Sequence, residues 1–207
     1  MSIRSTVACV AALAAAGLAL TGTDNPQVVI KTEKGDIVVE VALAKAPVTA
    51  ANFLRYVDAG LYEGATFHRT VTLSNQPGNA VRIEVIQGGQ LPASKVSPPI
   101  AHETTAVTGL RHLDGTISMA RSGPGTATSS FFFCINDQPE LDFGGRRNPD
   151  GQGFAAFGRV VSGMDVVRAI QTLPSEGQQL TPPVKIISVR RSDGPSKDVR
   201  MAQGGTP

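Results

Sequence analysis

Tryptophan is absent from this chain of 207 residues, and other aromatic residues and charged residues are scarce. Aromatic residues make up 5% of the sequence and charged residues 17%, below the roughly 25% charge of an average domain. The 19 lysines and arginines barely outnumber the 17 acidic residues, and no more than two basic residues stand together. Because a nucleic-acid binder needs a concentrated basic face, the composition argues against that class. The missing tryptophan by itself excludes no function.

Glycine and proline are too few for a low-complexity chain. They number 22 and 14, below the roughly 25–30% combined share that indicates disorder. Hydrophobic residues make up 41%, the mean hydropathy is +0.01, and the length suits one core better than two. We therefore expect one folded domain over residues 26–191. A flexible tail is expected over residues 192–207, which show no periodic apolar pattern.

Residues 1–22 have the pattern of an export signal. Arg4 supplies a positive start, residues 7–20 are uncharged and rich in Ala and Leu, and small residues follow. The apolar run is short for a membrane span of roughly 20 residues, so we expect a signal peptide, with an uncleaved anchor as the alternative. This predicts a periplasmic or secreted bacterial protein whose mature domain is not in a membrane. Cleavage would remove Cys9 and leave Cys134 alone, which excludes an intramolecular disulfide.

Short β-rich runs dominate the rest of the chain. Strands are predicted at residues 27–32, 35–43, 65–71, 81–86, 116–120, 131–135, 154–161 and 184–189. One helix is expected to begin near Pro47 and end at Gly60, and a second to follow Ser162 as its N-cap. This set favours a closed antiparallel barrel with helical plugs over a βαβ fold, with a sandwich as the competing architecture. The residues expected to fill the interior are Val39, Val41, Met119, Phe131 and Phe133.

Several catalytic motifs are missing. There is no G-x-S-x-G elbow and no Walker loop, and the glycines at 151 and 153 precede a strand rather than a helix. The histidines show no H-E-x-x-H spacing, and the turn at 148–151 lacks the bidentate Glu of a Ca²⁺ loop. No nucleophile–base pair suggests itself. An enzyme with this sequence is therefore expected to work without a metal, a cofactor or a covalent intermediate.

Five short motifs, taken in order, are more specific than any one of them alone. They are F-H-R at 67–69, I-Q-G-G at 86–89, G-T-I-S-M-A-R at 115–121, S-S-F-F-F at 129–133 and F-G-R-V-V at 157–161. Together they resemble the cyclophilin family of peptidyl-prolyl isomerases. The resemblance implies a mainly β fold, a closed eight-stranded antiparallel β-barrel capped by two α-helices. It also implies a peptidyl-prolyl cis-trans isomerase, expected as a monomer, that acts on proline-containing unfolded or extended polypeptides during the folding of exported proteins.

The chemistry of such an enzyme explains why the missing motifs are not needed. Resonance gives an X-Pro bond a rotation barrier of about 18–20 kcal/mol, and that resonance is lost in the twisted transition state. Catalysis needs a dry pocket for the proline ring and a hydrogen-bond donor aimed at the localised nitrogen lone pair. By the resemblance, Arg69 is that donor, Gln87 contacts both the substrate and Arg69, and Phe132 is the main pocket wall. We assign catalytic roles to these three residues.

Further residues match substrate-binding positions of the family. The resemblance makes some of them apolar walls of the proline pocket, and others backbone or polar contacts along the peptide. The expected substrate-binding residues are His68, Val85, Ala120, Arg121, Ser130, Leu141 and Phe154. Ala120 and Arg121 are expected to present backbone groups, so the side chain at position 121 can differ from that of the family. His68 is expected to support the site more than to react.

Four departures from the family pattern bear on activity. The stretch between the F-H-R and Q-G-G motifs is longer than usual, and residues 73–82 are expected to loop out beside the site. Glu84 falls where an apolar pocket residue is expected, and a carboxylate there would compete for the donors of Arg69. Ser130 stands where the family usually has Gln. Glu140 takes the place of the rim tryptophan that is associated with tight cyclosporin binding, so weak binding of that inhibitor is expected.

Two other classes of function stay open. One is a cyclophilin-like peptide-binding chaperone module with little or no turnover, which would use the same groove. The other is a barrel that carries a small lipophile, and the bulky residues expected inside the barrel argue against it. The retained Arg69, Gln87 and Phe132 favour an active isomerase.

Overall fold

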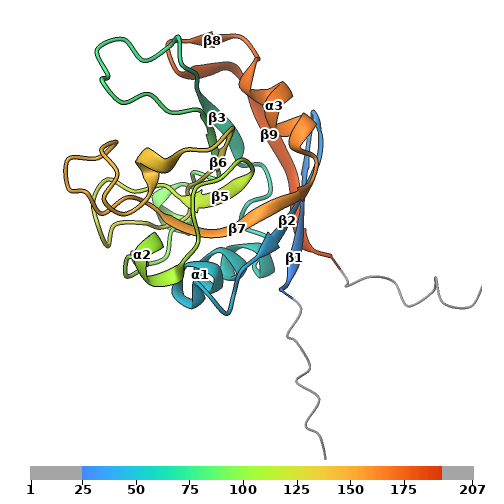
Figure 1. The fold of residues 1–207 in the computed structure, drawn as a ribbon. Coiled ribbons are helices and arrows are strands. Elements are labelled where there is room, and N and C mark those ends of the chain that lie inside the picture. Colours follow the sequence, from blue (N-terminus) through green and yellow to red (C-terminus); the bar gives the residue numbers. More distant parts are fainter. Residues whose placement is uncertain (1–24, 193–207) are drawn as a thin grey trace, which may run out of the picture.

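The computed structural model of this chain describes residues 25–192, in which eight strands close into an antiparallel β-barrel (Figure 1). Around the barrel the strands are β1 (Gln27–Thr32), β2 (Gly35–Val41), β7 (Ala155–Ser162), β5 (Thr116–Met119), β6 (Phe131–Cys134), β4 (Val85–Gly88), β3 (Thr66–Val71) and β9 (Gln179–Arg191). β1 pairs with both β2 and β9, which closes the sheet. A short strand, β8 (Ser175–Glu176), pairs with β9 in a hairpin. The predicted barrel is confirmed, and the sandwich alternative is wrong.

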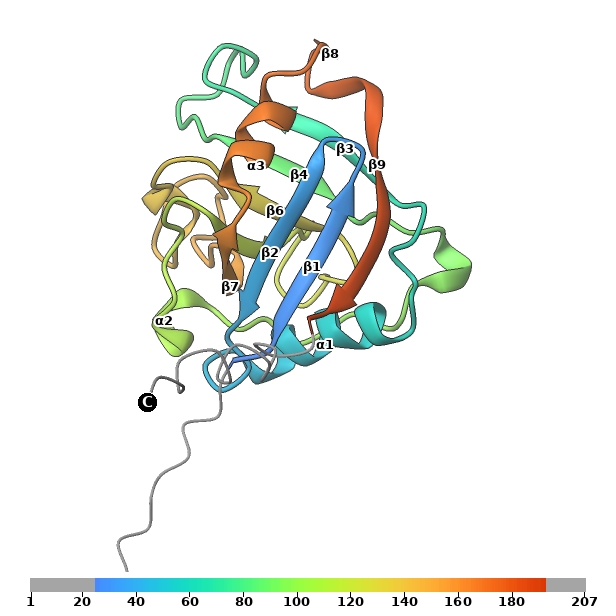
Figure 2. The same cartoon turned by 90° about the vertical axis from the view of Figure 1, so that its right-hand side faces the viewer.

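Two of the three α-helices in the described residues cover opposite ends of the barrel (Figure 2). α1 (Pro47–Asp58) lies across one end and α3 (Met164–Gln171) lies toward the other. These are the two helices that the sequence predicted. Sequence reasoning missed α2 (Thr105–Thr108), which is a single turn, and the 3₁₀ turns η1 (Ala93–Lys95) and η2 (Pro139–Leu141).

The start of α3 differs from the prediction. β7 continues through Ser162, and the N-cap is Gly163, which has a φ of 90° and no side-chain cap. A Cβ at Gly163 would clash with the carbonyl oxygen of Asp36 in β2. The expectation that Ser162 caps the helix is therefore wrong, because the close approach and the positive φ both require glycine there.

The barrel interior is filled by aromatic and branched side chains. Phe67, Phe131 and Phe133 are fully buried, and their ring centroids lie 5.8–6.1 Å apart. This core contains every residue predicted to lie inside: Val39, Val41, Met119, Phe131 and Phe133. A barrel packed in this way does not offer the ligand-holding interior of a lipophile carrier.

Some predicted boundaries shifted, and some predictions fall outside the described residues. β4 begins only at Val85, and β9 begins at Gln179, well before the predicted start. The signal peptide predicted at 1–22 lies outside the described residues, as does the tail predicted at 192–207 apart from its first residue. No helix between residues 25 and 192 combines the length and the apolar character that crossing a bilayer requires.

Candidate active site

The outer face of the barrel carries a second, smaller apolar cluster beside β3, β4 and β6. Strand alternation separates the two faces. Ile86 and Phe133 belong to the interior core, whereas their neighbours Val85 and Phe132 point outward. The outer cluster comprises Val71, Ile83, Val85, Phe132, Cys134 and Leu141, each no more than 6% exposed. An apolar surface of this kind can receive a ring from outside the barrel.

A β-bulge turns Arg69 to the same outer face. Phe67 pairs with Gly88 and Arg69 pairs with Gln87, so two steps along β3 match one step along β4, and His68 is the extra residue. Without the bulge, residues two apart would share a face. With it, Phe67 packs in the core while the side chain of Arg69 lies beside that of Gln87. The bulge thus brings the F-H-R and Q-G-G motifs together.

The two glycines of the Q-G-G motif are required by packing. A Cβ on Gly88 would lie 2.7 Å from Cδ1 of Phe67. Gly89 has a φ of 71°, and a Cβ there would clash with the ring of Phe131. Because both positions lack a side chain, β4 approaches its neighbours closely and holds Gln87 beside β3.

Two glutamine side chains clamp the guanidinium of Arg69. Gln87 Oε1 accepts a hydrogen bond from Nη1 at 2.8 Å, and Gln178 Oε1 accepts from Nε at 2.9 Å and from Nη2 at 2.6 Å. Gln87 was expected here, whereas sequence reasoning missed Gln178, which lies between β8 and β9. Within the described residues these bonds engage three of the five N–H groups of a guanidinium. The remaining N–H groups are available to a substrate.

Each glutamine is itself oriented by a neighbour. Ser130 Oγ donates to the Gly88 carbonyl oxygen at 3.1 Å and accepts from Gln87 Nε2 at 3.3 Å. Gln178 Nε2 donates to the carbonyl oxygen of Asn75 at 3.2 Å. These bonds occupy the amide nitrogens, so both amide oxygens turn to the guanidinium. Ser130, the departure from the usual Gln, therefore acts on the site through Gln87.

The positive charge at this site is half-buried. Burial lowers the pKa of Arg69 below its ordinary value, and the positive charge of Arg147 lowers it further. Burial also lowers the pKa of His68, against a backbone hydrogen bond at Thr66 that raises it and the charge of Arg69 that lowers it. At neutral pH, Arg69 therefore stays protonated and His68 is mostly neutral.

A cavity of about 240 Å³ opens beside Arg69 over the outer apolar cluster. Its wall consists of Arg69, Ile83, Val85, Gln87, Ala120, Arg121, Phe132, Leu141, Arg147, Asn148 and Phe154. Phe132 is 4% exposed and meets Phe154 edge-on at 5.3 Å between ring centroids. The structure therefore brings together eight of the ten predicted site residues, while His68 and Ser130 lie outside the wall. Sequence reasoning did not single out Ile83, Arg147 or Asn148.

A buried histidine supports Phe132. The rings of His112 and Phe132 are stacked with centroids 6.1 Å apart. His112 Nδ1 lies 2.7 Å from Asp142 Oδ1, and its Nε2 lies 2.9 Å from Ser118 Oγ. This is the order of a Ser-His-Asp triad, which no sequence motif revealed. Because Ser118 is fully buried and neither it nor His112 lines the cavity, we interpret the three residues as a structural support for Phe132 rather than a catalytic triad.

Glu84 does not compete for the donors of Arg69. Its carboxylate accepts hydrogen bonds from Asn136 Nδ2 at 2.9 Å and from Gln171 Nε2 at 3.4 Å, while Ile83 lines the cavity. The expectation that Glu84 occupies the apolar pocket position is therefore wrong. The physical reason is that the chain joins the sheet only after this residue. The register after the insertion therefore differs from the one expected from the family resemblance.

The side chain of Arg121 belongs to the scaffold of the site. Its Nη1 and Nη2 donate to the Asp150 carboxylate at 2.8 and 2.9 Å, and Nε donates to the Gly153 carbonyl oxygen at 2.8 Å. The guanidinium carbon also lies 5.1 Å from the ring centroid of Phe154. Arg121 thus ties the loop between η2 and β7 to the cavity wall.

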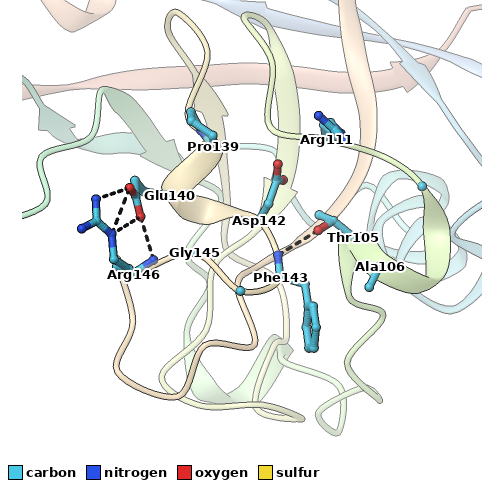
Figure 3. A pocket seen from close by; sticks show the side chains of 11 residues that line it. Thr105, Ala106, Arg111, Pro139, Glu140, Asp142, Phe143, Gly145 and Arg146 are labelled. Atoms are coloured by element: carbon cyan, nitrogen blue, oxygen red, sulfur yellow. Dashed lines mark hydrogen bonds and ion pairs between the residues drawn. The ribbon is translucent and has the colours of Figure 1, made fainter.

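A larger cleft of about 650 Å³ lies next to η2 (Figure 3). Glu140, expected at the rim of the proline pocket, lines this cleft, and Arg146 Nη2 lies 2.6 Å from its Oε1. The backbone N–H of Phe143 donates to Thr105 Oγ1 at 2.9 Å in the same cleft. None of the residues predicted to be catalytic lines it. The smaller cavity beside Arg69 is therefore the candidate active site.

The barrel and the clamped arginine define a cyclophilin. A family model described as "Cyclophilin type peptidyl-prolyl cis-trans isomerase/CLD" matches residues 27–191, and the chain belongs to that family. It is a cyclophilin-type peptidyl-prolyl cis-trans isomerase.

Individual relatives agree with this assignment. "Peptidyl-prolyl cis-trans isomerase A" of Dickeya dadantii is 37% identical over 179 residues, covering 84% of this chain and 86% of that protein. "Peptidyl-prolyl cis-trans isomerase B" of Escherichia coli is 38% identical over 148 residues, covering 70% and 83%. A cyclophilin-type isomerase of Cryptosporidium parvum shares the fold, with a TM-score of 0.66, 22% identity and coverage of 83% and 99%. Its structure in the presence of the dipeptide Ala-Pro aligns with a TM-score of 0.63, 22% identity and coverage of 80% and 98%.

Proposed function

We propose that this chain accelerates X-Pro isomerisation by taking the proline ring out of water and donating an N–H of Arg69 to the twisted amide. The observation that supports this proposal is the position of the Arg69 guanidinium. Gln87 and Gln178 hold it beside a cavity whose wall includes Phe132. A donor held in this way needs little reorganisation when the nitrogen lone pair localises. The clamp therefore favours the transition state over the planar amide.

The apolar cavity also favours the twisted amide over the planar one. A planar amide is polarised by resonance, whereas the twisted amide has lost that resonance. Transfer from water to an apolar surface therefore disfavours the planar form more than the twisted one. In this proposal the proline ring packs on Phe132 and Leu141, which are 4% and 0% exposed and belong to the outer apolar cluster.

For substrates we propose proline-containing unfolded or extended polypeptides, among them exported proteins. The dipeptide named with the Cryptosporidium parvum structure supports the first part. The signal-like pattern of residues 1–22 supports the second. N-terminal sequencing of the protein recovered from its native host tests the export step. A start after the apolar run is expected, and a start at Met1 in a cytoplasmic fraction would contradict export.

A proline-limited refolding assay tests the mechanism. Wild-type protein is expected to accelerate refolding, and Arg69→Ala to lose at least about tenfold of the acceleration. One transition-state donor contributes up to roughly 2.7–4 kcal/mol, which corresponds to a loss of about 100- to 1000-fold. Arg146→Ala is the control, because this exposed arginine lies outside the cavity wall. Equal rates for wild type and Arg69→Ala would disprove the role of Arg69. No acceleration by the wild type would instead favour a peptide-binding chaperone module.

A further inference from the structure

Two arginines line the proline cavity without an acidic partner. Within the described part of the chain, Arg69 binds only glutamine oxygens, and Arg147 donates from Nη1 to the carbonyl oxygen of Val81 at 2.7 Å. No acidic residue of the stretch 25–192 belongs to the cavity wall. Among residues 25–192, neither arginine takes part in an ion pair. The substrate site therefore carries positive charge that the protein leaves uncompensated.

The acidic side chains of η2 and the loop that follows it are already engaged. They form the pairs Asp150–Arg121 at 2.8 Å, Glu140–Arg146 at 2.6 Å and Asp142–His112 at 2.7 Å. Each of these contacts satisfies a carboxylate away from Arg147. Compensation by a nearby carboxylate of the same loop would require breaking one of them.

Arg147 is held against the protein at both ends. Its backbone N–H donates to the carbonyl oxygen of Glu140, and its side chain reaches the insertion at Val81. It thus connects the loop after η2 with the inserted loop 73–82 beside the cavity. Burial lowers the pKa of Arg147, and its charge lowers the pKa of Arg69. Two half-buried cations that repel each other are stabilised by an incoming anion.

We propose that Arg147, together with Arg69, makes this isomerase prefer substrates with a carboxylate side chain on a residue that flanks the proline. This inference rests on the proposed function, which places the proline ring in the cavity. The side chains of the flanking residues then lie next to the cavity wall, to which Arg147 belongs. Guanidinium groups bind carboxylates with charge-assisted and often paired hydrogen bonds. The preferred class is Glu or Asp directly before or after proline.

Peptide binding measured by fluorescence anisotropy tests the preference without relying on turnover. The probes are Ala-Ala-Pro-Glu-Ala and Ala-Glu-Pro-Ala-Ala, each with a matched peptide in which Gln replaces Glu. In at least one pair we expect wild-type protein to bind the Glu peptide about three- to fivefold more tightly at low salt, as for a partly exposed ion pair. The ratio should fall toward one at about 0.5 M NaCl, because salt screens the pair.

Three variants separate the role of Arg147 from a general charge effect. Arg147→Gln should bring the Glu/Gln binding ratio close to one, and Arg147→Lys should keep part of the preference. Arg55→Gln, at an arginine of α1 that lies outside the cavity wall and forms no ion pair among residues 25–192, should keep the wild-type ratio. A wild-type ratio near one in both peptide pairs would overturn the inference, as would an unchanged ratio in Arg147→Gln. Isomerisation is assayed separately, so a binding preference without acceleration would contradict the proposed function alone.

Discussion

The Gln178 side-chain oxygen accepts hydrogen bonds from both Nε and Nη2 of Arg69, which lies 109 residues earlier in the chain. With Gln87 on the opposite side, it sets the plane of the guanidinium and thereby the direction of the remaining N–H groups. The geometry of the candidate site thus depends on a loop between β8 and β9 as much as on β3 and β4, which carry the recognisable motifs.

Replacing Gln178 by Ala should reduce kcat/KM for a prolyl peptide by about tenfold, since hydrogen bonds to a charged group contribute roughly 1.5–3 kcal/mol. The loss should appear mainly in kcat, because Gln178 is not part of the cavity wall. Gln179→Ala is the matched control, as this neighbouring side chain is exposed. A kcat/KM for Gln178→Ala equal to that of the control would show that Gln87 alone positions the guanidinium.

Deleting residues 73–82 should leave a folded barrel with reduced activity. The two ends of the loop are already close, because Gln76 Nε2 donates to the carbonyl oxygens of both Thr72 and Ile83, at 2.7 and 2.8 Å. The deletion removes no member of either apolar cluster. It does remove the carbonyl of Asn75 that orients Gln178. Thermal unfolding followed by circular dichroism should stay cooperative, and a non-cooperative transition would show that the insertion is structural.

His112→Leu should lower the free energy of unfolding by about 2–3 kcal/mol, because it leaves the buried hydroxyl of Ser118 without its partner and removes the imidazole from the Asp142 carboxylate, which keeps the backbone N–H of residue 112 as a donor. Urea denaturation measures this loss. In a double-mutant cycle, adding Ser118→Ala should cost less in the His112→Leu background than in wild type, since the partners are in contact. Strictly additive losses would mean that the two side chains do not act as a unit.

Asp150 should titrate well below an ordinary aspartate. The hydrogen bonds from Arg121 lower its pKa from 3.8 to about 2. A depressed pKa in the folded state means that the stabilisation is complete above the unfolded value and is lost as the pH falls from about 3.8 toward 2. NMR titration of the carboxyl carbon should show this pKa, and Asp150→Asn should flatten the pH dependence of unfolding in that window. A pKa near 3.8 would mean that the Arg121 pair is absent in solution.

The sequence by itself determined the family, the barrel and most of the cavity wall. Alternation along β4 and β6 decides that Phe132 and Val85 face outward, and glycines at 88 and 89 allow the close strand packing that holds Gln87. Strand alternation and the need for glycine act over a few neighbouring residues, so short sequence motifs are enough to predict them.

The tertiary structure alone decided how the arginine is held and what charge surrounds it. Gln178 and Arg147 come from loops whose position depends on the closed barrel, and the register of Glu84 depends on where the insertion rejoins the sheet. The ring of His112, which bonds the nearby Ser118 in β5, meets Phe132 because β5 and β6 are neighbours in space. Contacts between distant segments follow from packing of the whole chain, and no spacing pattern in the sequence encodes them.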